Sequence, residues 1–125
     1  MIRTRILAAT LGALAALAFA APALAQTGAD SGIRSGQQML DQCSSTKAAD
    51  IAACEAFLTG AHNSFIYLQD IGQTDKDICV PPGTTPAALR QVAVDYWRAN
   101  PASRKFSAVS SFWNALVARF PAPCA

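Results

Sequence analysis

The sequence comprises 125 residues and carries a formal net charge of +2. Two of its ten Lys and Arg residues, Arg3 and Arg5, lie at the very start, which leaves 8 basic against 8 acidic residues in the remainder. This balance excludes the basic stripe of a nucleic-acid-binding protein and the polybasic tail of a protein that binds a membrane surface.

The N-terminal segment has the features of a cleaved export signal. Two arginines precede an apolar run over residues 6–20, and an Ala-x-Ala sequence ends at Ala25. We therefore predict a signal peptide over residues 1–25 and a mature periplasmic domain over residues 26–125. A membrane anchor is the alternative, but the apolar run is shorter than the about 20 residues that span a bilayer. We expect no membrane contact after cleavage.

All four cysteines lie in the mature part of the chain: Cys43, Cys54, Cys79 and Cys124. An even count in a small exported domain indicates two disulfides. A zinc site is the alternative, but it would need closely spaced cysteine pairs or nearby histidines, so we predict no metal and no cofactor. Four cysteines allow three pairings, and spacing alone does not choose among them.

Apolar residues recur at helical spacing in four stretches, and no stretch alternates over the length of a strand. The first two predicted helices cover residues 32–44 and 48–69 and are joined by a polar turn. Gly60 lies inside the second helix, where a glycine costs about 1 kcal/mol relative to alanine. We expect this glycine to mark a close crossing of two helices.

A long irregular segment, residues 70–83, separates these helices from the next pair. Thr85 and a following proline are suited to cap and start a third helix, which ends at Asn100 because the residue before a proline avoids helical geometry. Asn100 is also expected to cap a fourth helix. Its apolar stripe comprises Ala102, Phe106, Val109, Trp113, Leu116, Val117 and Phe120.

These elements predict an all-α fold, a small four-helix domain made of two αα-hairpins and stapled by two disulfides. Each predicted hairpin brings one pair of cysteines together, so we predict the bridges Cys43–Cys54 and Cys79–Cys124. We expect six large side chains to be mostly buried: Leu58, Phe65, Leu89, Phe106, Trp113 and Leu116.

Residues suited to catalysis are sparse. His62 is the only histidine, and its position beside an apolar stripe predicts a partly exposed helix residue. Asp75 and Asp77 are close in sequence, but a solvated loop explains them better than an acid/base pair. Trp97 and Phe112 are either core residues or exposed aromatic anchors for a partner. The sequence therefore favours a binding or structural protein over an enzyme.

Several short segments form a further pattern. They are CEAFLTGAHN from Cys54, CVPPG from Cys79, YWRANP from Tyr96, then Ala115-Leu116, Phe120-Pro121 and the closing Cys124. In order and spacing they resemble the type VI secretion amidase immunity family of the Rap/Tai type, over about residues 40–125. Three positions depart from the family's pattern, and none of them is a cysteine: Ala56, Asn63 and Ala122-Pro123.

The resemblance implies a non-enzymatic, all-helical periplasmic protein that binds and inhibits a cognate cell-wall amidase effector. It also implies a homodimer, since family members often dimerise. The alternative is a standalone periplasmic binding or structural protein of the same fold with no effector partner. A small hydrolase that uses His62 is a third hypothesis.

The segment from Gly72 to Ile78 is the predicted contact surface. Long loops in compact domains are often functional, and Cys79 anchors this one at its far end. Family members that block an enzyme with a loop favour this interpretation, and a plain solvated connector is the alternative. The predicted partner-binding residues are Gln73, Thr74, Asp75, Lys76, Asp77 and Ile78.

Overall fold

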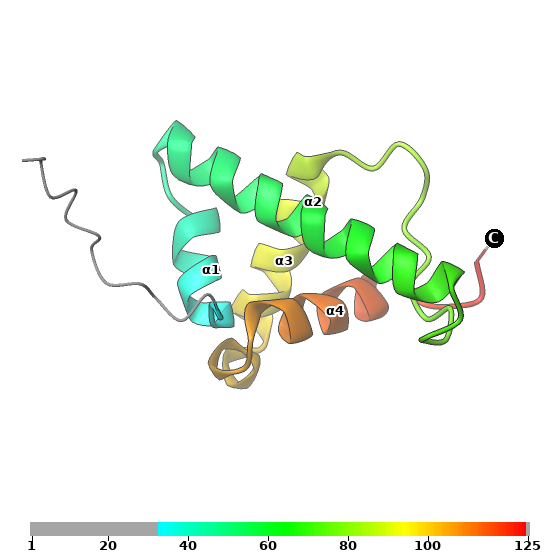
Figure 1. The fold of residues 1–125 in the computed structure, drawn as a ribbon. Helices are drawn as coiled ribbons and strands as arrows, with labels where there is room; N and C mark the ends of the chain where they lie inside the picture. The colour runs from blue at the N-terminus through cyan, green and yellow to red at the C-terminus, as the bar shows by residue number, and fades with distance from the viewer. Residues whose placement is uncertain (1–32, 125) are drawn as a thin grey trace, which may run out of the picture.

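Figure 1 shows the computed structural model, which describes residues 33–124. In chain order its elements are α1 (Gly36–Cys43), α2 (Ala48–Asp70), α3 (Pro86–Ala99), the 3-10 helix η1 (Pro101–Lys105) and α4 (Ala108–Arg119). Within the described range only two isolated β-bridges accompany the helices, so the all-α prediction is confirmed. The predicted signal peptide lies outside the described residues.

Helix α1 begins later than the predicted residue 32. Its start is fixed by Ser35, whose side chain accepts a hydrogen bond from the Gln38 backbone while the Gln38 side chain accepts one from the Ser35 backbone. This reciprocal capping ends the preceding extended segment. Two backbone hydrogen bonds join this start to the segment before α4. The Gly36 N–H donates to the Phe106 carbonyl at 2.9 Å, and the Ala108 N–H donates to the Arg34 carbonyl at 2.7 Å.

Gly36, the first residue of α1, and Gly60, inside α2, have different roles, which the sequence did not distinguish. A Cβ added at Gly60 would meet nothing within 4 Å, so the predicted close helix crossing at this residue is wrong. The close approach occurs at Gly36, where a Cβ would lie 2.9 Å from the Trp97 Nε1 atom and 3.0 Å from the Ser111 Oγ atom. Gly36 therefore lets α1 pack directly against the core.

Helix α3 has the start and end that its sequence predicts. The Thr85 hydroxyl accepts a hydrogen bond from the Ala88 N–H, and Pro86 occupies the first turn. At the other end the Asn100 side chain donates to the Tyr96 carbonyl, and the Arg104 guanidinium donates to the Trp97 carbonyl at 2.6 Å. These side chains satisfy carbonyls that the end of a helix leaves unpaired.

The predicted fourth helix starting at Asn100 is wrong, because the chain breaks into η1 and α4. Phe106 is extended between them, and Ser107 caps α4 by accepting from the Ser110 N–H. The break changes which residues face inward. Phe106 is 55% exposed rather than buried, and Trp113 is only half-buried, with its ring 4.8 Å from that of Phe65.

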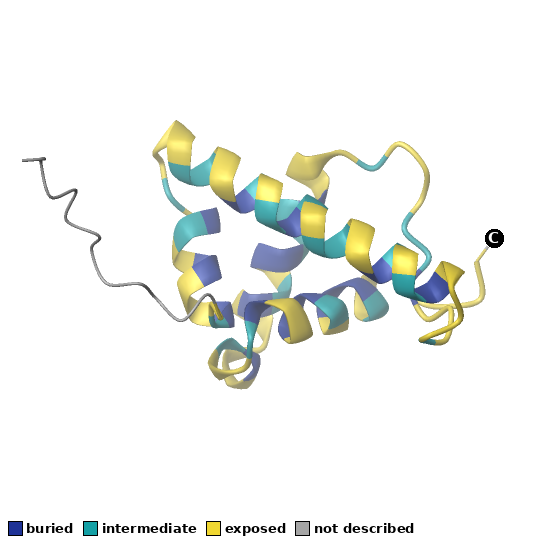
Figure 2. Cartoon of the chain, in the orientation of Figure 1, coloured by how far each residue is buried: buried dark blue, intermediate teal, exposed yellow. Residues whose placement is uncertain are grey.

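The core lies where α1, α3 and α4 meet beneath the inner face of α2, as the buried segments in Figure 2 show. Leu58, Phe65, Leu89 and Leu116 are buried as predicted. Trp97 and Phe112 are both 0% exposed, so they are core residues and not partner anchors. The Trp97 indole N–H donates to the Ser111 hydroxyl at 2.9 Å, which satisfies the buried donor.

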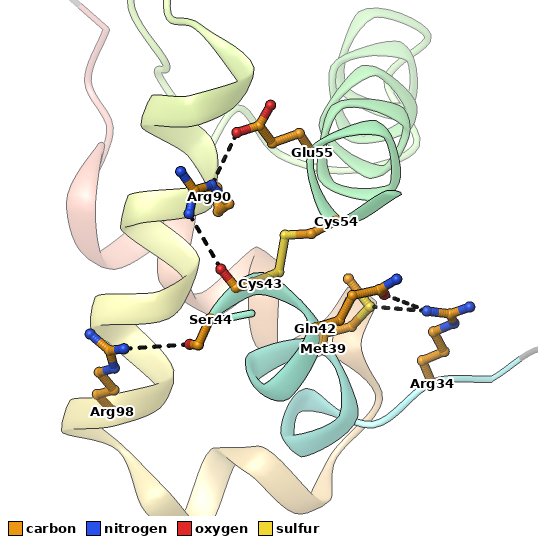
Figure 3. The surroundings of a disulfide bond; sticks show 9 residues. All are labelled: Arg34, Met39, Gln42, Cys43, Ser44, Cys54, Glu55, Arg90 and Arg98. Carbon is orange, nitrogen blue, oxygen red and sulfur yellow. Dashed lines mark hydrogen bonds and ion pairs between the residues drawn. A yellow bond between two sulfur atoms is a disulfide. The ribbon is translucent and has the colours of Figure 1, made fainter. Parts of the chain in front are cut away.

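Both predicted disulfides, Cys43–Cys54 and Cys79–Cys124, are present. The first is fully buried and lies beside Arg90, as Figure 3 shows. Arg90 forms an ion pair with Glu55 at 3.0 Å and donates to the Cys43 carbonyl at 3.3 Å. It thereby joins α3 to both helices of the first hairpin.

Candidate functional site

The predicted contact loop is a short surface segment after α2. Gln73, Asp75, Lys76 and Asp77 are exposed and Thr74 is half-buried. Ile78, in contrast, is 2% exposed and forms a β-bridge with Pro121, so its side chain belongs to the core. The structure therefore brings four of the six predicted residues to the surface and uses Ile78 to hold the loop in place.

Backbone hydrogen bonds fix both ends of this loop. At its start Gly72 has a φ of +72°, a conformation that favours glycine, and the Gln73 N–H bonds the Leu68 carbonyl at 2.9 Å. At its end the Cys79 N–H bonds the Phe120 carbonyl at 2.9 Å. The buried Gln69 side chain also donates to the Ile78 carbonyl at 3.4 Å. The backbone of the exposed residues between these anchors is therefore restrained at both ends.

Two exposed apolar residues adjoin the loop, Tyr67 in the last turn of α2 and Ile71 directly after the helix. Tyr67 is 62% exposed and Ile71 is 48% exposed, and their spacing of four residues places them on one face at the end of the helix. Neither residue is among the contact residues predicted from the sequence. The signal available was that both fall outside the apolar stripe of α2. We define the loop surface as Tyr67, Ile71, Gln73, Asp75, Lys76 and Asp77.

Charge is unevenly distributed between the two ends of the domain. Asp70, Asp75 and Asp77 lie at the loop end with Lys76 and with Arg119, which ends α4 next to the Phe120 carbonyl that bonds Cys79, so this end has three carboxylates against two cations. Arg98, Arg104 and Lys105 lie at the end of α3 and in η1. Figure 1 places these two ends on opposite sides of the molecule. The loop surface is thus the acidic end.

His62 lies on α2 and is half-buried, as predicted. Burial lowers its pKa below the ordinary value of 6.5, so the imidazole is neutral near pH 7. Its Nε2 atom is buried without a hydrogen-bond partner, as is the Oγ1 atom of Thr59 one turn earlier. Both residues line a cavity of about 350 Å³ between α2 and residues 80–86.

Neither a metal centre nor a membrane span is found in the described part of the chain. Within residues 33–124, no three His, Cys, Asp or Glu side chains gather closely enough to hold a metal ion. None of the helices in this range combines the length and the apolar character that crossing a bilayer requires.

Comparison with known proteins gives one match. Residues 35–124 match the family described as Rap1a immunity proteins. Neither the search of curated proteins nor the search of solved structures found a match. The matched range runs from the cap of α1 to Cys124 and includes every described helix and both disulfides. Because this match covers well over half of the sequence, the chain belongs to the family of Rap1a immunity proteins.

Proposed function

We propose that the mature domain is a periplasmic immunity protein that binds and inhibits a peptidoglycan amidase effector of type VI secretion. The family match over residues 35–124 is the observation that carries the proposal, because immunity proteins act by binding a cognate effector. The amidase as target and the secretion route follow from the resemblance of the sequence motifs.

The periplasmic location is supported by two features. The N-terminal segment has the charge, apolar run and small residues of a cleaved signal, with the cut after Ala25. All four cysteines are paired in disulfides, which form and persist in oxidising compartments such as the bacterial periplasm. We therefore propose that the domain meets the effector in the compartment that contains the cell wall.

We propose that inhibition is steric and involves no catalysis by this chain. The loop surface supports this mode of action, because its backbone is anchored at Gly72 and Cys79 and loses little freedom on binding. Tyr67 and Ile71 offer apolar area, and aromatic side chains are frequent anchors of interfaces. Asp75, Lys76 and Asp77 offer charges that would select a partner of complementary charge.

The proposal predicts that a gene for a peptidoglycan amidase lies beside the gene for this chain, and the test of function is inhibition of that amidase. The disulfide-bonded mature domain is added in increasing amounts while hydrolysis of purified peptidoglycan by that amidase is measured. We expect hydrolysis to stop at a stoichiometric amount of the domain. An amidase that keeps full activity in an excess of folded domain would contradict the proposal and favour a standalone envelope protein of the same fold.

The test of the surface is a triple substitution of Asp75, Lys76 and Asp77 to Ala. We expect the Kd for the amidase to rise about 10-fold or more, since truncated interface charges typically cost 1–3 kcal/mol or above. The matched control replaces Asp41, Lys47 and Asp95, which are also exposed and carry the same charges. We expect the control to bind like the unmodified domain. Equal Kd values for both variants would show that the amidase contacts another face of the domain, and the proposed function would still stand.

A further inference from the structure

The cavity beside His62 has the size and position of a ligand pocket. Its volume of about 350 Å³ falls within the range of about 300–1,000 Å³ that is usual for such pockets. One wall is the middle of α2, and the other is the segment over residues 80–86. Figure 1 shows the chain turning in the loop after α2, after which this segment runs back above α2 and enters α3.

The two walls differ in chemistry. The segment over residues 80–86 contributes mostly apolar side chains, among them Val80, Pro81 and Pro82, and its one polar lining residue, Thr84, already donates its hydroxyl to the Pro81 carbonyl at 2.7 Å. Helix α2 contributes Thr59, His62 and Asn63, which lie on one face of the helix because they are three and four residues apart. The pocket therefore combines an apolar wall with a short row of hydrogen-bonding groups.

Two of these hydrogen-bonding groups lack partners. The Thr59 Oγ1 and His62 Nε2 atoms are buried and make no hydrogen bond. Buried polar atoms nearly always have a hydrogen-bond partner, so two atoms without a partner in one pocket wall need an explanation. A ligand group that bonds both atoms would remove their desolvation penalty. The Thr59 hydroxyl can turn toward such a group by changing rotamer.

The lining also selects the charge of a ligand. Among the residues that line the pocket, none carries a formal charge near pH 7, because His62 is kept neutral by its burial. A charged ligand would lose its hydration there without gaining an opposite charge. The pocket thus favours a neutral ligand with an apolar body and one polar tip.

We propose that this pocket receives a tyrosine side chain of the partner protein. The aromatic ring would pack against Pro81 and Pro82, and the phenol would reach Thr59 and His62. A phenol both donates and accepts a hydrogen bond, so it can satisfy a threonine hydroxyl and a neutral imidazole together. Tyrosine is also a side chain that combines a large apolar area with a polar tip. The inference rests on the proposed function for the source of the tyrosine.

The preference of the pocket can be measured without the partner. N-acetyl-L-tyrosinamide and N-acetyl-L-phenylalaninamide are titrated separately into the disulfide-bonded mature domain. Binding is followed by NMR of the imidazole ring, which reports the pocket directly because His62 is the only histidine in the chain. We expect the tyrosine probe to shift the imidazole signals and to bind about 10-fold more tightly than the phenylalanine probe, as expected for paired buried polar groups.

Two threonine variants make the test specific. Thr59→Val keeps the shape of the side chain and removes the hydroxyl, so it should abolish the preference for the tyrosine probe. Thr46→Val changes an exposed threonine in the turn before α2 and should leave the preference intact. Both variants are checked for folding by circular dichroism. The proposal is overturned if the two probes bind equally, if Thr59→Val keeps the preference, or if neither probe shifts His62 at its solubility limit.

Failure of this inference is distinguishable from failure of the proposed function. Inhibition of the amidase together with no probe binding would reject the pocket and keep the immunity role. Selective probe binding in a domain that leaves the amidase active would reject the immunity role and support the pocket. A crystal structure with ordered water as the sole partner of Thr59 and His62, together with equal probe binding, would assign the cavity to solvent.

Discussion

Gly36 is the residue at which the packing of α1 leaves the least room. An added methyl group would lie within 3.1 Å of Trp97, Ser111 and the backbone of Arg104. We expect Gly36→Ala to lower the free energy of unfolding by about 1–3 kcal/mol, the usual cost of overpacking a core. Urea denaturation of the disulfide-bonded domain measures this change.

Gly60 is the matched control for that substitution. It lies inside α2, and its surroundings are open. Gly60→Ala should therefore raise the free energy of unfolding by about 0.5–1 kcal/mol, because alanine favours the helix over the unfolded chain. The same sign for both substitutions would contradict the assignment of the close approach to Gly36.

His62 makes the stability of the domain depend on pH. Burial lowers the folded-state pKa of its imidazole below 6.5, so the unfolded chain binds more protons between the lowered pKa and 6.5. The contribution of His62 to stability is complete above this window and is lost as the pH falls through it. We expect the unmodified domain to lose more stability than His62→Gln between about pH 7.5 and about pH 5.5. Urea denaturation of both proteins at each pH measures the difference, and equal losses would show that His62 is hydrated in the folded state.

Single residues also show what sequence patterns leave undecided. Leu58 and Leu89 were predicted to be buried from their spacing alone, and the structure confirms both. The roles of Gly36 and Gly60 were not predictable, because a glycine looks the same in the sequence whether it faces a neighbouring helix or solvent. The unpaired atoms of Thr59 and His62 depend on residues 80–86, which are distant in the sequence.

At the level of elements, the break before α4 decides which aromatic residues support the core. Phe112 is fully buried, whereas Phe106 is 55% exposed. We expect Phe112→Ala to cost about 3–5 kcal/mol of unfolding free energy and Phe106→Ala to cost less than about 1 kcal/mol. Thermal and urea denaturation of both variants measure these costs. A larger loss from Phe106→Ala than from Phe112→Ala would contradict the break and support the single continuous helix that the sequence predicts.

The two disulfides differ in their access to solvent. Cys43 and Cys54 are 0% exposed, whereas Cys79 is half-buried and Cys124 is exposed. Thiol–disulfide exchange needs contact between the attacking thiolate and a sulfur atom. We therefore expect a mild reductant to open Cys79–Cys124 before Cys43–Cys54. Alkylation at successive times followed by peptide mapping gives the order, and early labelling of Cys43 would contradict it.

Some helix boundaries are set by neighbouring residues and others by residues distant in the sequence. The start of α3 was predictable because the chemistry of Thr85 and Pro86 acts on the helix that follows directly. The break at Phe106 was not predictable from its neighbours. It coincides with backbone hydrogen bonds to Arg34 and Gly36, which lie some 70 residues earlier in the chain. Pairing over such a distance leaves no periodic signal in the local sequence.

For the whole molecule, the fold was more predictable than the site. Short connections between helices gave the hairpins, and the hairpins gave both disulfide pairings, which the structure confirms. Of the candidate site, the loop between Gly72 and Cys79 was visible as an irregular stretch. The exposure of Tyr67 and Ile71 agrees with their positions outside the apolar stripe of α2. The burial of Ile78 was not visible, because it follows from the bridge between the loop and the distant Pro121.

The loop end carries a small excess of carboxylates, whereas Arg98, Arg104 and Lys105 lie at the η1 end, so the two ends of the domain differ in charge. An approaching partner with a basic active-site rim would feel a torque that turns Asp75 and Asp77 toward it before any contact forms. Such orientation raises the fraction of collisions that lead to binding, and dissolved salt weakens it. Orientation before contact therefore acts on the rate at which a partner is captured, independently of how tightly it is held once bound.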